Sequence, residues 1–182
     1  LPGMDEAARV GFIALASAGL MPAGADLYMH QQRMLQAAMQ RKHCVVVTGT
    51  GSGKTESFLL PVLASIAREA LRGAGGWARA TPKFPLPSEW RSAPSWDFGR
   101  AVERGESRRP AVRALLLYPM NALVEDQMSR LRRALDSDEA HAAFDQYWGA
   151  NRVRFGRYNG ATPVPGHPWR LDDQGQREPN KP

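Results

Sequence analysis

A short apolar run that ends in a glycine-rich loop constrains this chain most. Residues 45–47 are three consecutive valines, and residues 48–55 follow them with the sequence T-G-T-G-S-G-K-T. β-Branched residues favour a buried strand, and a long helical pattern begins directly after the loop. A strand, a glycine loop and a helix in this order are typical of a phosphate-binding P-loop. The sequence therefore predicts a site for a nucleoside triphosphate.

Each part of this loop has a physical role in holding an anion. Gly49, Gly51 and Gly53 allow a tight turn that points successive backbone N–H groups into one concavity, and the following helix adds the positive end of its dipole. The Lys54 ammonium is expected to reach the β- and γ-phosphates of ATP, and the Thr55 hydroxyl to bind Mg²⁺. The whole predicted nucleotide-binding segment consists of Thr48, Gly49, Thr50, Gly51, Ser52, Gly53, Lys54 and Thr55.

The loop departs from the general G-x-x-x-x-G-K-[ST] pattern at its first place, where Thr48 stands instead of glycine. In this form it resembles motif I of superfamily 2 helicases and translocases. The alternative is a glycine-rich turn that precedes Lys-Thr without binding a ligand. The strand before the loop and the helix after it argue against that alternative.

Upstream of the loop, residues 27–31 (L-Y-M-H-Q) resemble the helicase Q motif. A glutamine amide offers both a donor and an acceptor, so it can pair with the edge of adenine. The resemblance makes Gln31 the adenine reader, with the adjacent Gln32 as the alternative residue. Because glutamines are common on helix surfaces, a solvated side chain without a ligand is the other interpretation.

Residues 117–127 (L-Y-P-M-N-A-L-V-E-D-Q) resemble helicase motif Ia, whose usual form is P-T-[RK]-A-L-x-x-[DQ]-Q. In the family this loop contacts the nucleic-acid backbone, and a loop that enters a helix N-terminus suits phosphate binding. The resemblance places Pro119, Met120 and Asn121 at the nucleic acid. Since Met120 and Asn121 replace the usual threonine and basic residue, contact would fall to backbone N–H groups and the Asn121 amide.

Residues 155–163 (F-G-R-Y-N-G-A-T-P) resemble the Y-[DN]-G-x-T-P segment of YprA-like and MrfA-like DEAD/DEAH-box DNA helicases and of related large helicases of bacterial anti-phage systems. This resemblance places Tyr158, Asn159, Gly160 and Thr162 beside the DNA strand that is tracked, and a plain turn is the alternative. The motifs follow one another in the family's order. Together they imply a DNA helicase or translocase, with DNA favoured over RNA.

The tetrapeptide Asp138-Glu139-Ala140-His141 spells D-E-A-H, the form of helicase motif II, which holds Mg²⁺ and polarises the attacking water. Motif II follows a buried strand, whereas residues 131–137 are charged and helical in period. The family also places motif II after the Y-N-G-x-T-P segment. We therefore interpret the tetrapeptide as a solvated helix start. We expect a missing carboxyl-terminal part to supply motif II and the second RecA-like lobe. This piece alone should therefore hydrolyse ATP barely or not at all.

The predicted fold class is α/β, an incomplete RecA-like P-loop domain with a parallel β-sheet flanked by helices. Strands are expected at residues 45–47, 111–118 and 151–158, and helices at residues 5–18, 26–40, 56–72, 121–135 and 136–148. Residues 1–25 would form a helical lead-in, residues 26–163 the ATP-binding lobe and residues 164–182 a loosely ordered tail. Within the lobe, residues 74–110 form an irregular insertion rich in Trp, Pro and Arg, either a surface excursion or a surface for nucleic acid or another domain.

The composition limits which binding partners and which cellular setting are expected. The chain has 182 residues and a formal net charge of +6, which favours a polyanion such as nucleic acid over a merely solvated basic surface. Its single cysteine, Cys44, excludes an internal disulfide and favours the cytoplasm, and no apolar span reaches the ~18 residues of a transmembrane helix. Two other classes stay open: a P-loop NTPase that does not act on nucleic acid, and a non-catalytic nucleic-acid-binding module with a structural P-loop.

Overall fold

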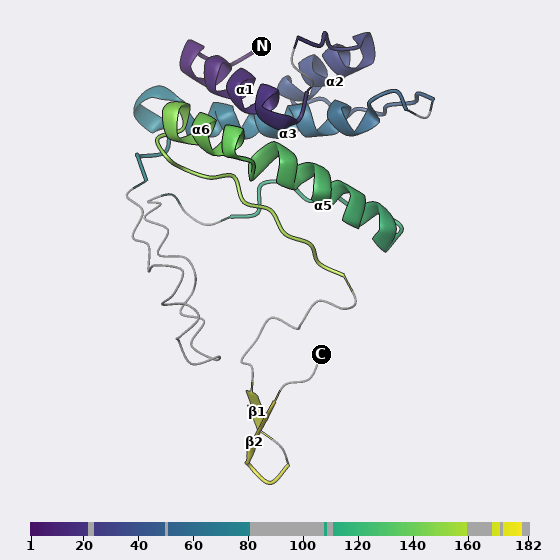
Figure 1. The fold of residues 1–182 in the computed structure, drawn as a ribbon, viewed down its shortest axis with the longest axis vertical. Helices are drawn as coiled ribbons and strands as arrows, with labels where there is room; N and C mark the ends of the chain where they lie inside the picture. The colour runs from purple at the N-terminus through teal and green to yellow at the C-terminus, as the bar shows by residue number, and fades with distance from the viewer. Residues whose placement is uncertain are drawn as a thin grey trace.

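The computed structural model describes residues 1–21, 24–49, 51–80, 108, 111–159, 169–171 and 173–179. Within these ranges the helices are α1 (Glu6–Gly19), α2 (Met29–Met39), α3 (Lys54–Ala70), α5 (Asn121–Leu135) and α6 (Asp138–Tyr147). A 3₁₀ turn, η1 (Gly73–Gly75), follows α3, and a hairpin of β1 (Trp169–Leu171) and β2 (Arg177–Pro179) lies near the carboxyl terminus. Figure 1 shows the helices stacked on one another, with α3 running through the group.

Local capping decides where the helices begin. The Asp5 carboxylate accepts from the N–H of Ala8 (2.8 Å) before α1 and so caps this helix. Helix α2 begins at Met29, three residues after the start of its predicted range at Asp26, because the Gln31 side chain turns back to accept from the N–H of Tyr28. Helix α5 begins at Asn121, the first residue of its predicted range. Met120 precedes it, and no side chain caps the helix.

Helix α3 is the centre of the core. Helices α1 and α2 both pack on α3, while α5 and α6 pack on α1 (Figure 1). Ala64 and Ala67 of α3 are completely buried, and such small side chains let neighbouring helices approach closely. Trp148, directly after α6, donates its indole N–H to the carbonyl oxygen of Gly11 in α1 (3.0 Å). Its ring makes an edge contact with Phe144 of α6, with the centroids 5.4 Å apart. The packing of α6 on α1 and the buried hydrogen bond together hold the two helices.

The predicted parallel sheet is wrong for the part of the chain that the structure describes. Residues 45–47, 111–118 and 151–158 are not helical, but none of them belongs to a sheet ladder. The side chains of Val45 and Val112 are 90% and 86% exposed, whereas a strand buried on both faces would hide them. A strand requires a hydrogen-bonded neighbour on at least one edge, and no described segment supplies one here. Apolar residues of these segments pack one-sidedly on the helices instead, namely Leu116, Val153 and Phe155.

The sheet that is present among the described residues is a two-stranded antiparallel hairpin inside the predicted tail. Strand β1 pairs with β2 so that Trp169 lies opposite Pro179 and Leu171 opposite Arg177. Gly175, in the connecting turn, has a φ of +75°, a conformation that glycine adopts without steric cost. The turn residue therefore accounts for a hairpin that the polar composition of the tail did not indicate.

The close approach of α1 to α5 makes a test of the packing. A Cβ added to Gly19 would lie 2.3 Å from the carbonyl oxygen of Arg133, so Gly19→Ala should destabilise the fold by about 1–3 kcal/mol. Helix propensity alone would predict the opposite sign. Gly156→Ala is the control, because a Cβ there meets nothing within 4 Å. Urea denaturation measures both variants, and equal stability of the two would contradict the described packing.

Candidate nucleotide-binding site

The predicted phosphate loop lies directly before α3. Gly51 and Gly53 both have a φ of +73°, which explains why glycine stands at these two places. Gly53 is the N-cap of α3 and provides no side chain to bond the first N–H groups of that helix. A helix start without a side-chain cap leaves N–H donors and a positive dipole end for an anion. Thr50, also predicted to bind the nucleotide, lies outside the described residues.

The loop is closed on itself by its own polar side chains. The Lys54 ammonium donates to the carbonyl oxygen of Thr48 (3.0 Å) and to that of Gly49. The Ser52 hydroxyl hydrogen-bonds with Oγ1 of Thr48 (2.7 Å) and with the carbonyl oxygen of Gly49 (2.8 Å). Lys54 is exposed and makes these contacts at the surface, so an incoming phosphate can replace the carbonyl oxygens as its partner. Thr55 follows in the first turn of α3 and is half-buried.

Gln31 connects the Q-motif segment to this loop. Its side chain is 2% exposed, and its Nε2 donates to the carbonyl oxygen of Gly53 (3.0 Å). Its Oε1 accepts from the backbone N–H of Tyr28 (2.9 Å), while the ring of Tyr28, exposed to solvent, stacks on His30 with the centroids 5.6 Å apart. Gln32, the alternative residue, instead donates to the carbonyl oxygen of Leu27 at the surface. The structure therefore brings Gln31, rather than Gln32, against the phosphate loop.

The motif Ia segment leads into α5. Pro119, Met120 and Asn121 are all exposed, and the N-terminus of α5 carries no side-chain cap. Burial raises the pKa of the neighbouring Tyr118 phenol. The start of α5 thus presents backbone N–H groups at the surface, without a cationic side chain among these three residues.

The second predicted nucleic-acid segment lies beside α5. Arg157 forms an ion pair with Glu125, one helical turn from Asn121, so Tyr158 lies near the start of α5. The Tyr158 side chain is 79% exposed. Asn159 is half-buried, and Gly160 and Thr162 lie outside the described residues. The two predicted nucleic-acid segments are therefore neighbours as far as the structure describes them.

Comparison with known proteins decides the family. The DEAD/DEAH box helicase family matches residues 28–173, which is most of the chain and contains every candidate site residue above. The chain belongs to the DEAD/DEAH box helicase family. The resemblance to superfamily 2 helicases is thereby confirmed. No solved structure matches the chain.

Two curated relatives agree with this membership. The chain is 37% identical to the Druantia protein DruE of Escherichia coli (strain UMEA 4076-1) over 142 residues, which are 76% of this chain and 6% of that protein. It is 31% identical to the DEAD-box ATP-dependent RNA helicase 9 of Oryza sativa subsp. japonica over 122 residues, which are 67% of this chain and 17% of that helicase. The chain thus spans only a small part of either relative.

The D-E-A-H tetrapeptide begins α6, as predicted. Asp138 and Glu139 are exposed in the first turn, and the Ser137 hydroxyl caps the helix by accepting from the N–H of Ala140 (3.2 Å). Nε2 of His141 lies 3.1 Å from Oδ1 of Asp136. In the described ranges no group of three or more His, Cys, Asp or Glu side chains could hold a metal ion, and no helix is long and apolar enough to cross a membrane.

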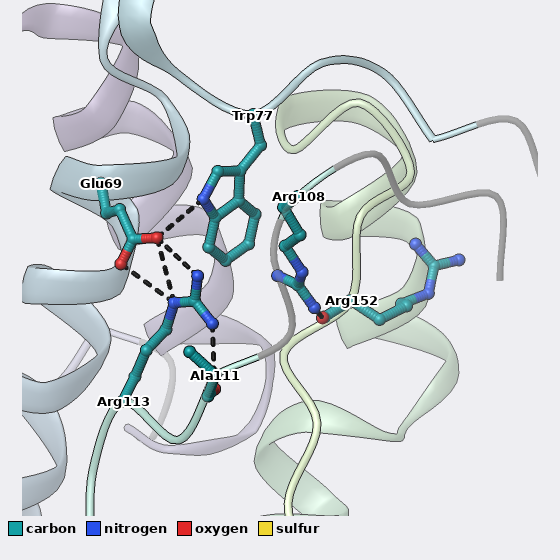
Figure 2. A network of polar contacts seen from close by, with 6 residues as sticks. All are labelled: Glu69, Trp77, Arg108, Ala111, Arg113 and Arg152. Carbon is teal, nitrogen blue, oxygen red and sulfur yellow. Dashed lines mark hydrogen bonds and ion pairs between the residues drawn. The ribbon is translucent and has the colours of Figure 1, made fainter. Parts of the chain in front are cut away.

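Sequence reasoning missed a polar cluster at the other end of α3, which we call the Glu69 clasp. Figure 2 shows the Glu69 carboxylate facing both the guanidinium of Arg113 and the indole of Trp77. Arg113 donates through Nη2 to Oε1 (2.7 Å) and through Nε to Oε2 (2.9 Å), and Trp77 donates to Oε1 (3.0 Å). The guanidinium of Arg108 lies 3.9 Å from the centroid of the Trp77 ring and donates to the carbonyl oxygen of Arg152 (2.5 Å).

The Glu69 clasp brings together residues from both ends of the predicted insertion, residues 74–110, and from just after it. Trp77 precedes residues 81–107, while Arg108 and Arg113 follow them, and all three gather at the end of α3 (Figure 2). In the described part of the insertion, Trp77 and Arg108 therefore contact one another and the helical part of the chain. Trp90 and Trp96, the other tryptophans of the predicted insertion, lie outside the described residues. Non-periodic arginines give no sequence signal for such a long-range pairing.

The clasp predicts a pH dependence of stability. The pKa of Glu69 is lowered from 4.5, chiefly by the hydrogen bond from Arg113. Desolvation opposes this shift, and the hydrogen bond from Trp77 adds to it. A carboxyl whose pKa is lower in the folded state stabilises the fold above its unfolded pKa and loses that contribution as the pH falls through the folded value. Glu69→Gln should therefore lower the melting temperature slightly at pH 7. Below about pH 4.5 the melting temperature of this variant should decrease less with falling pH than that of the unaltered chain.

Thermal melts between pH 7 and pH 3 check this expectation, with Asp173→Asn in the hairpin turn as the control. Asp173 is exposed and distant in sequence from the clasp. Identical pH profiles for the unaltered chain and Glu69→Gln would show that the clasp contributes no stability.

Proposed function

We propose that the chain is the ATP-binding part of an ATP-dependent helicase or translocase that acts on nucleic acid, with DNA favoured over RNA. The observation that carries this proposal is the uncapped start of α3, with Gly51 and Gly53 in the left-handed region and Lys54 beside them. The family membership and the positive net charge support it. The cellular setting that we propose is the cytoplasm.

The residues of the loop fit a magnesium nucleotide. Backbone N–H groups from Gly51 to Thr55 offer donors for phosphate oxygens, and a Cβ at Gly53 would collide with Nε2 of Gln31, so a side chain there would displace the Gln31 amide. Lys54 would exchange the carbonyl oxygens of Thr48 and Gly49 for the β- and γ-phosphates. Thr55 would supply a hydroxyl ligand to Mg²⁺, which when bound neutralises phosphate charge.

We assign the reading of adenine to Gln31. An amide has two N–H donors and two acceptor lone pairs, and the contacts to Gly53 and Tyr28 use one of each. One donor and one acceptor position remain for a base edge. Gln31 would in this way recognise the base while it holds the residue that precedes Lys54.

We assign nucleic-acid contact to the start of α5 and to the segment at Tyr158. The backbone N–H groups of Met120 and Asn121, directly after Pro119, would donate to a phosphate, with the Asn121 side-chain amide beside them. The exposed ring of Tyr158 offers a stacking surface for a base, and Asn159 a polar contact, with Gly160 and Thr162 completing the sequence motif. The Arg157–Glu125 ion pair, which keeps Tyr158 near α5, supports a shared surface.

Hydrolysis would need parts that we assign to the remainder of the protein. We propose that motif II and a second RecA-like lobe complete the site, so that this chain binds ATP but turns it over little. A P-loop NTPase that does not act on nucleic acid would bind ATP without responding to an oligonucleotide. A module with a structural P-loop would bind the oligonucleotide in a salt-dependent way but would not bind ATP.

Removal of the Lys54 ammonium tests the nucleotide site. Lys54→Ala should weaken binding of a fluorescent ATP analogue in the presence of Mg²⁺ by about ten- to a hundred-fold, because charge-assisted hydrogen bonds to the phosphates are lost. Lys42→Ala, another exposed lysine, is the matched control and should bind normally. Fluorescence titration gives both affinities. Unchanged binding by Lys54→Ala would leave the loop without its proposed role.

A further inference from the structure

Helices α3 and α5 are linked by an ion pair that neither the motifs nor the family match assigns. Arg130 of α5 lies 3.1 Å through Nη1 from Oε1 of Glu56 in α3. No Cα atom of α5 lies within 8 Å of a Cα atom of α3, so the two helices do not pack directly. A cavity of about 410 Å³ separates the end of α1, the start of α3 and the middle of α5, and it is lined by Glu56, Asp126, Arg130 and Arg133 among others. The ion pair spans this gap.

Glu56 lies against the phosphate loop. It follows Thr55 directly, and its side chain is only 16% exposed. A Cβ added to Gly53 would lie 3.2 Å from Oε2 of Glu56, so the carboxylate packs on the residue that precedes Lys54. A negative charge at this place repels the phosphates of a nucleotide unless a cation compensates it.

Arg130 is held so that it can supply that compensation. Its Nε lies 3.2 Å from Oδ2 of Asp126, one turn earlier in α5, and the amide of Gln127 donates to the same oxygen (3.0 Å). The Arg130 guanidinium therefore lies between two carboxylates, one on each helix. Its side chain is 43% exposed, so an ordinary surface ion pair would contribute little to stability. Its partner Glu56 lies against the phosphate loop, and this gives the ion pair a consequence beyond stability.

We propose that Arg130 is a positioning residue that neutralises Glu56 and thereby couples the nucleotide site to the nucleic-acid surface at the start of α5. This inference rests on the proposed function. A bound triphosphate attracts the guanidinium and repels the Glu56 carboxylate, so it changes the balance of the two ion pairs of Arg130. Because Arg130 belongs to the helix that begins at Asn121, that change reaches the motif Ia loop. Coupling between two binding sites is reciprocal, so the oligonucleotide must change nucleotide affinity by the same factor.

Charge-changing variants of the full chain test the proposal. The probe is a fluorescent ATP analogue with Mg²⁺, titrated with and without a saturating single-stranded DNA oligonucleotide. Arg130→Gln should weaken analogue binding about three- to ten-fold, since Glu56 is left uncompensated in a partly screened site. The ratio of the two affinities, with and without DNA, should fall towards one. Arg130→Lys keeps the charge and should bind within about two-fold of the unaltered chain.

A rescue distinguishes positioning from folding. The double variant Arg130→Gln with Glu56→Gln removes both charges and should recover most of the lost analogue affinity, but not the coupling to DNA. Arg132→Ala, an exposed arginine of the same helix, is the control and should leave analogue affinity unchanged. Circular dichroism verifies that each variant is folded.

The outcomes separate this inference from the function on which it rests. Normal analogue binding by Arg130→Gln, or a loss that Glu56→Gln does not rescue, overturns the role of Arg130 alone. If the unaltered chain binds no analogue, the proposed function fails and the role of Arg130 fails with it.

Discussion

The hydrogen bond from the Gln31 amide to the carbonyl oxygen of Gly53 is the contact on which the candidate site depends. One buried side chain fixes two helix starts, because its other end accepts from the N–H of Tyr28 before α2 while Gly53 caps α3. An amide left buried without partners costs about 1–3 kcal/mol, so the bond is costly to break. Because of the same proximity, a side chain at Gly53 would displace the Gln31 amide from this bond. The Q-motif segment and the phosphate loop are thus one structural unit.

Helix α3 connects that unit to the rest of the molecule. Its first turn holds Thr55 and Glu56, its middle is the buried centre of the core, and its last turn ends at the Glu69 clasp. Through Arg113, the clasp holds residues 111–118 at the last turn of α3. Arg130 of α5 forms an ion pair with Glu56 in the first turn of α3. The motif Ia segment therefore lies between two ion pairs that both end on α3. The Arg130–Glu56 ion pair thus links the helix that follows the phosphate loop to the helix that follows the motif Ia loop.

The sequence predicted the local elements better than their assembly. Helices with a strong apolar period, such as α3 and α5, appear within a few residues of their predicted bounds. The charged, helical period of residues 131–137 predicts that the D-E-A-H tetrapeptide begins a helix, and the Ser137 hydroxyl caps that helix. The parallel sheet failed because an apolar run such as residues 45–47 indicates burial but does not supply a pairing partner. Neither Arg130–Glu56 nor Arg113–Glu69 leaves any periodic signal, since each joins residues far apart in the chain.

Amide resonances of the phosphate loop test the central claim most directly. Addition of a non-hydrolysable ATP analogue with Mg²⁺ should shift the backbone N–H resonances of Gly51, Gly53 and Lys54 progressively until the site is saturated. The reason is that these N–H groups would donate to phosphate oxygens instead of to their partners in the free protein. The Gln31 side-chain amide should keep its bond to Gly53 through the titration. Loop resonances that stay unchanged at saturating analogue would contradict a nucleotide site built on this loop.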